Sequence, residues 1–61
     1  MEDMMVLFHF KDKEIEKVLK EIAEIIVIDF ELGCAFIKTE KEKSDILELP
    51  GVVKVIKKSE V

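Results

Sequence analysis

The chain contains no arginine, asparagine, glutamine, tryptophan or tyrosine, and it has one cysteine, one proline and two glycines. Without arginine it cannot form the bidentate forks with which proteins hold phosphates and carboxylates. Its net charge of −4 also argues against a basic surface, so we expect no nucleic-acid partner. The single cysteine, Cys34, excludes an internal disulfide.

Long apolar runs are missing as well. No run reaches the ~18 residues that a membrane span requires, and Glu2 and Asp3 stand where a signal peptide would carry basic residues. We therefore expect a soluble, cytoplasmic protein with no membrane partner. The length of 61 residues and the hydrophobic content of 49% predict a single domain over residues 1–61. Many lysines and glutamates without amides are typical of heat-adapted proteins.

In the first half of the chain, the spacing between apolar residues changes twice. Residues 4–10 are apolar and rich in phenylalanine, which predicts a strand. Asp12 is a suitable cap for a helix with one apolar stripe, made of Ile15, Val18, Leu19, Ile22 and Ile26. The period then becomes two, which predicts a second strand whose apolar face carries Ile26, Ile28, Phe30 and Leu32.

The second half repeats the order of strand, helix and strand. Gly33 predicts a tight hairpin or a bulge before a third strand over residues 34–37. Thr39 with Glu42 has the spacing of a capping box, which predicts a second helix that ends near Leu49. The residues of this helix that we expect to face the sheet are Lys43, Ile46 and Leu47.

The dipeptide Pro50-Gly51 ends this second helix. Residues 52–56 are β-branched apart from one lysine and predict the last strand, and residues 57–61 form a polar tail. The resulting order β-α-β-β-α-β predicts an α+β, ferredoxin-like sandwich. Right-handed crossovers place two helices on one face of a four-stranded antiparallel sheet, with the fourth strand beside the first, then the third and the second.

Strand alternation predicts which residues lie on each face of this sheet. The set expected to face the helices is Val6, Phe8, Phe10, Ile28, Phe30, Ile37, Val53 and Val55. The set expected to face away is Met5, Leu7, His9, Val27, Phe36, Lys54 and Ile56. Because Lys38 shares a face with Phe36 and favours water, we place Phe36 outside and Ile37 inside, although the third strand is apolar on both faces.

The outward set is too apolar for a surface that meets only water, and large exposed apolar patches mark interaction sites. We therefore predict an interface with a protein partner, which includes a homo-oligomer. The alternative is that a loop or the tail shields the patch. The predicted interface residues are Met5, Leu7, Val27, Phe36, Lys54 and Ile56.

Catalytic and metal-binding signals are weak in this chain. His9, Glu31 and Cys34 fall at one edge of the predicted sheet and are possible zinc ligands, but no Cys-x-x-Cys or His-x-x-His spacing supports them. Cys34 lacks an orienting group that would make it a nucleophile with His9. Asp29 and Glu31 are two strand positions apart, and charges of that kind protect sheet edges. We expect no enzyme activity, no cofactor and no metal site.

The second half of the chain resembles the propeptide inhibitor domain of subtilisin-like proteases over roughly residues 29–56. The likeness lies in the third strand from Gly33 to Ile37, in Thr39 at the start of a helix, and in Leu49-Pro50-Gly51-Val52 with Val55. It implies an open sheet face that packs on a protease through Phe36 and Ile56, and a tail over residues 57–61 that lies in the protease cleft. Lys57 and Lys58 depart from the acidic residues usual there.

Three functional hypotheses follow from these patterns. The first is a small non-enzymatic interaction or structural module that uses its open sheet face to bind itself or another protein. The second, implied by the resemblance, is a propeptide-like inhibitor or folding chaperone of a protease. The third is a small-molecule sensor similar to amino-acid-binding ACT domains, which share the element order, although no glycine-rich ligand turn is evident.

Overall fold

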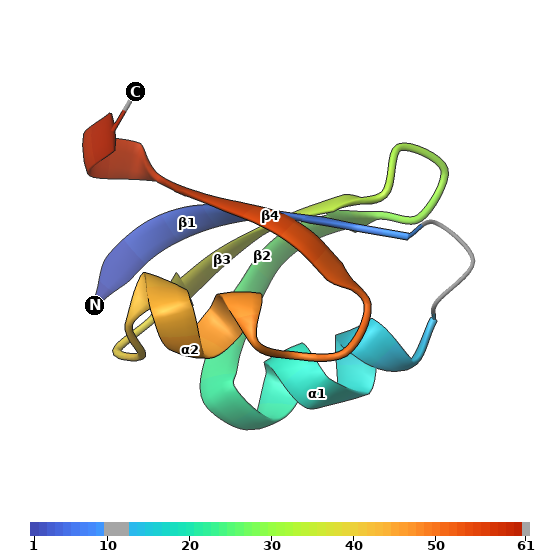
Figure 1. Cartoon of the computed structure of the whole chain (residues 1–61), viewed down its shortest axis with the longest axis horizontal. Helices are drawn as coiled ribbons and strands as arrows, with labels where there is room; N and C mark the ends of the chain where they lie inside the picture. Colours follow the sequence, from blue (N-terminus) through green and yellow to red (C-terminus); the bar gives the residue numbers. More distant parts are fainter. Residues whose placement is uncertain (10–12, 61) are drawn as a thin grey trace.

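The computed structural model describes residues 1–9 and 13–60. Strand β1 (Glu2–Phe8) leads to helix α1 (Glu14–Ile22), the hairpin of β2 (Ala23–Asp29) and β3 (Cys34–Thr39), helix α2 (Lys43–Leu47), strand β4 (Val52–Lys57) and the 3-10 turn η1 (Lys58–Glu60). The sheet is antiparallel with strand order β2-β3-β1-β4. Both helices lie on the same side of it (Figure 1). The predicted ferredoxin-like fold is confirmed; the roles predicted for Phe10 and Asp12 lie outside the described residues.

The core lies between the sheet and the two helices. Alternate residues of β1 and β3 are buried in it together with residues of both helices and β4: Met4, Val6, Phe8, Ile15, Leu19, Ala35, Ile37, Ile46 and Val55. The predicted faces of β1 and β3 are therefore confirmed where described. Ile37 is completely buried, whereas its neighbour Phe36 is 47% exposed.

Strand β2 begins earlier than the helical stripe predicts. Helix α1 ends at Ile22, and the run that follows is extended from Ala23. The prediction of Ile26 as a helical residue is thus wrong, and the predicted second strand forms over Ala23–Asp29 instead of residues 26–32. The reason is the β-branched run over residues 25–28, which favours a pleated strand over a further helical turn.

A four-residue turn joins β2 to β3 and corrects two predicted strand positions. Asp29 accepts the backbone N–H groups of Glu31 (2.9 Å) and Leu32 (3.1 Å) on one carboxylate oxygen, which is how aspartate stabilises turns. Leu32 is 76% exposed in this turn, whereas the Phe30 ring packs edge-on against Phe8 with 5.9 Å between ring centroids. Gly33, with φ of 71°, closes the predicted hairpin.

Each edge strand of the sheet contains a β-bulge. In β2, Ile25 pairs with Ile37 and Val27 with Phe36, so Ile26 is the extra residue. In β4, Lys54 pairs with Leu7 and Val52 with Phe8, so Val53 is extra. Because a bulge shifts the alternation by one residue, Val52 takes the inward place predicted for Val53, which is 58% exposed.

Helix α2 is capped by a different pair from the one predicted. Glu42 is the cap residue, and its N–H donates to the Asp45 carboxylate at 3.3 Å. Thr39 instead ends β3, where its buried hydroxyl donates to the Ile22 carbonyl at 2.8 Å and accepts the Lys41 N–H at 3.0 Å. Of the three residues predicted to face the sheet, Ile46 is buried.

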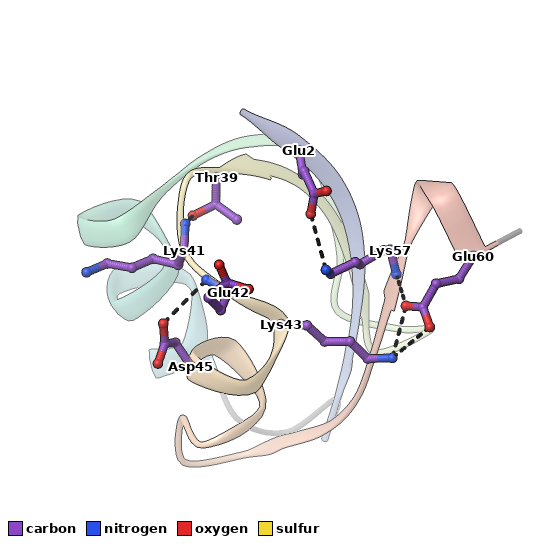
Figure 2. Close-up of polar contacts among 8 residues, drawn as sticks. All are labelled: Glu2, Thr39, Lys41, Glu42, Lys43, Asp45, Lys57 and Glu60. Atoms are coloured by element: carbon purple, nitrogen blue, oxygen red, sulfur yellow. Dashed lines mark hydrogen bonds and ion pairs between the residues drawn. The ribbon is translucent and has the colours of Figure 1, made fainter.

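The other two, Lys43 and Leu47, lie at the surface of α2. Leu47 is 45% exposed. The Lys43 ammonium bonds both carboxylate oxygens of Glu60, at 2.9 and 3.1 Å, and Glu60 also accepts the backbone N–H of Lys57 at 3.0 Å. Figure 2 shows these contacts, which hold η1 beside α2. A five-residue helix has too few inward positions for all three side chains to be buried.

Candidate protein-interaction face

The sheet face opposite the helices, which we call the open face, carries the outward residues of all four strands. The cross-strand pairing arranges them in three rows that run perpendicular to the strands. The first is a charged row of Glu24, Lys38 and Asp3, which Lys58 of η1 extends through its ion pair with Asp3. The second is an apolar row of Val27, Phe36, Met5 and Ile56. The third is a mixed row of Asp29, Cys34, Leu7 and Lys54.

A groove of about 470 Å³ lies along the apolar row. Its lining includes Met5, Phe36 and Ile56 of that row, the bulge residue Ile26, and the pair Asp3 and Lys58 at one end. The carboxylate of Asp3 and the ammonium of Lys58 are 3.7 Å apart. The other residues named here present only apolar side chains to a ligand or a partner.

The six predicted interface residues all lie on the open face. Val27 is 53% exposed and Phe36 is 47% exposed. Met5, Leu7 and Ile56 are half-buried between their cross-strand neighbours, and Lys54 is exposed. The structure thus places the set on one surface, and its role as an interface stays a prediction.

The sequence reasoning missed one apolar residue of this surface and its charged border. Ile26 is 51% exposed and lines the groove, because the bulge puts it beside Val27 instead of on the opposite face. The border residues Glu24, Asp29 and Lys58 were not assigned to the interface. The sequence contains a signal for these three residues, because each is a charged residue next to an apolar strand pattern.

The three possible metal ligands occupy different elements. His9 follows β1 and donates its backbone N–H to the Gly51 carbonyl at 3.2 Å. Glu31 lies in the β2–β3 turn, and Cys34 is the first residue of β3. Among residues 1–9 and 13–60, no group of three or more His, Cys, Asp or Glu side chains is placed to hold a metal ion.

Besides the Asp3–Lys58 pair of the open face, the contacts of Glu60 and Lys57 shown in Figure 2 hold the C-terminal end of the chain. The backbone N–H of Lys57 and then the Lys43 ammonium stabilise the charged Glu60 carboxylate, so the pKa of Glu60 lies below its ordinary value. Lys57 also pairs with Glu2 of β1 at 3.7 Å. Of the tail that the propeptide resemblance assigns to a protease cleft, Lys57, Lys58 and Glu60 pair with residues of the domain itself.

The fold and this surface define a small ferredoxin-like α+β domain with a solvent-facing apolar groove on its sheet. Comparison with protein-family models, with curated proteins and with solved structures finds no match to this chain. Neither described helix has the length and apolar character needed to cross a membrane.

Proposed function

We propose that this chain is a non-enzymatic protein-interaction module that binds its partner through the open face. The observation that carries the proposal is the apolar row with its groove, which continues across all four strands on the side away from α1 and α2. Ile26, Val27 and Phe36 expose about half of their side chains next to the half-buried Met5 and Ile56. A patch of this kind on so small a domain marks an interaction surface.

The chemistry of the groove favours a protein surface over a small polar ligand. Its volume of about 470 Å³ lies within the range of small-molecule sites, but such sites combine apolar walls with several convergent polar groups. Here the polar groups at the groove, Asp3 and Lys58, pair with each other. A partner that offers apolar side chains would match the remaining lining.

The test compares two substitutions of equal charge and nearly equal exposure. Phe36 is 47% exposed on the open face, and Leu47 is 45% exposed on α2, on the helical side. The native chain and the Phe36→Asp and Leu47→Asp variants are expressed at native level in the source cells, and the mass of each intact complex is measured. Far-ultraviolet circular dichroism of the purified variants checks that both fold.

We expect the native chain and Leu47→Asp in a complex larger than the protomer, and Phe36→Asp at the protomer mass. An aspartate buried in the interface would lose its hydration without a partner, whereas the aspartate of the Leu47→Asp variant would remain in water. If Phe36→Asp keeps the same complex as the native chain, the open face is not the docking surface. If the native chain itself has the protomer mass, the proposal fails.

A further inference from the structure

The two edges of the open face carry charges of opposite sign. The β2 edge presents Glu24 and Asp29, and the β4 edge presents Lys54 and, directly after the strand, Lys58 of η1. Between them the charged row alternates in sign, with Lys38 next to Glu24 and Asp3 next to Lys58. The face is therefore polarised across the strands, from an acidic edge through an apolar centre to a basic edge.

This polarity distinguishes the ways in which two copies can meet face to face. When the two sheets pack with aligned strands, a two-fold axis between them runs either parallel to the strands or perpendicular to them. With the parallel axis, the β2 edge of one copy lies over the β4 edge of the other, and each row meets itself in reverse order. Glu24 then lies opposite Lys58 of the second copy, Lys38 opposite Asp3, and Asp29 opposite Lys54.

The perpendicular axis gives the opposite electrostatic result. It lays β2 over β2 and β4 over β4, and it exchanges the charged row with the mixed row. Glu24 then faces Asp29 of the second copy, and Lys58 faces Lys54. Like charges at an interface cost binding free energy and exclude wrong arrangements, so this axis is disfavoured.

We propose that the partner of the open face is a second copy of this chain, bound face to face about a two-fold axis parallel to the strands. This inference rests on the proposed function, because it assumes that the open face is a docking surface. The apolar rows of the two copies form the centre of the interface, where Phe36 lies over Met5 of the second copy. Sulfur–aromatic contacts of this kind are favourable.

The geometry of sheet packing is compatible with these contacts. Aligned sheets pack about 10 Å apart and rotated by about 30°, so the outer ends of a row are displaced by a few Å, a distance that lysine and glutamate side chains span. Four strands about 4.8 Å apart and a β1 of about 23 Å give a face of ~440 Å² in projection. That is the low end for specific interfaces, and we expect a dissociation constant in the micromolar range.

The test exchanges the charges of one predicted contact. Glu24→Lys and Lys58→Glu are made separately and together in the full chain, and association of the purified proteins is measured by sedimentation equilibrium from about 1 to about 500 μM. In the dimer each exchange places like charges opposite each other at two symmetric positions. We expect each single variant to dimerise at least about tenfold more weakly than the native chain, since each like-charge contact is unfavourable.

Mixing the two single variants should restore the native affinity. In the mixed dimer, Glu24 of the Lys58→Glu chain meets Lys58 of the other chain, and the two exchanged residues meet each other. The double variant should recover for the same reason. Any destabilisation within a protomer is the same in the separate and the mixed samples. A recovery of the dimer affinity on mixing therefore shows that residues 24 and 58 meet across the interface. Should circular dichroism show a single variant unfolded, Glu24→Gln and Lys58→Gln replace it, and each should weaken the dimer.

Other outcomes separate this inference from the proposed function. A native chain that is monomeric at 500 μM alone but part of a larger complex in cells, lost with Phe36→Asp, would overturn the dimer and leave the docking face in place. A dimer that Phe36→Asp dissociates but that the charge exchange does not affect would overturn the axis. A dimer unaffected by Phe36→Asp would overturn both the proposed docking face and the proposed dimer.

Discussion

Replacement of Ile46 by alanine should remove a large fraction of the stability of this domain. Ile46 is completely buried and is the buried residue of the five-residue α2. Truncation of such a side chain costs about 2–5 kcal/mol through lost burial and the cavity that remains. Alanine has the higher helix propensity, which offsets only a few tenths of a kcal/mol of this cost.

The total stability of the domain sets the scale of this effect. At about 0.05–0.15 kcal/mol per residue, a chain of 61 residues has an unfolding free energy of ~3–9 kcal/mol. A loss of about 3 kcal/mol, with a urea slope near 1 kcal/mol/M, moves the midpoint down by ~3 M. Since the chain has no tryptophan or tyrosine, unfolding is followed by far-ultraviolet circular dichroism at one fixed protein concentration.

Leu47→Ala is the matched control, one residue further along the same helix. Leu47 is 45% exposed, so its truncation removes about half of a side chain's burial and should cost no more than ~1 kcal/mol. Equal midpoints for Ile46→Ala and Leu47→Ala would refute the reasoning, because they would mean that α2 does not close the core through Ile46.

Two further predictions concern the turns of the chain. Gly33→Ala should lower the unfolding free energy by about 1–2 kcal/mol in the same urea assay, because φ is 71° there and a Cβ disfavours the left-handed region; an unchanged midpoint would contradict this. The lowered pKa of Glu60 means that its stabilising charge is present above the unfolded value of 4.5 and is lost as pH falls below it. Carboxyl NMR should give a Glu60 midpoint below 4.5 in the native chain, and a midpoint at or above that value would refute the contacts with Lys43 and Lys57.

The sequence patterns predicted the fold because alternation and turn residues agree over most of the chain. In β1 and β3 the inward side chains alternate with outward ones, and the structure follows them residue by residue. Gly33 and Gly51 both have positive φ at the positions where a turn was expected. The order of elements then left few possible topologies.

The errors in strand face assignment at the two bulges lie where the sequence is apolar on both faces. Residues 25–28 read Ile-Ile-Val-Ile and residues 52–53 read Val-Val, so an extra residue leaves no mark in the pattern. The bulges at Ile26 and Val53 exchanged the faces that simple alternation assigns. The polarity of the open face could not be predicted from the sequence for a different reason. It combines charges from separate elements, and their positions relative to one another depend on the register between the strands.

The two bulges lie on β2 and β4, which are the outer strands of the sheet. Bulges twist an edge and interrupt the regular ladder that another strand would extend. Edge-to-edge addition leaves the second edge of each copy free to pair again, which is a route to fibres, whereas face-to-face pairing about a two-fold axis uses up its own surface. The face-to-face dimer proposed above would therefore stop at two copies, because the bulged edges disfavour further strand addition.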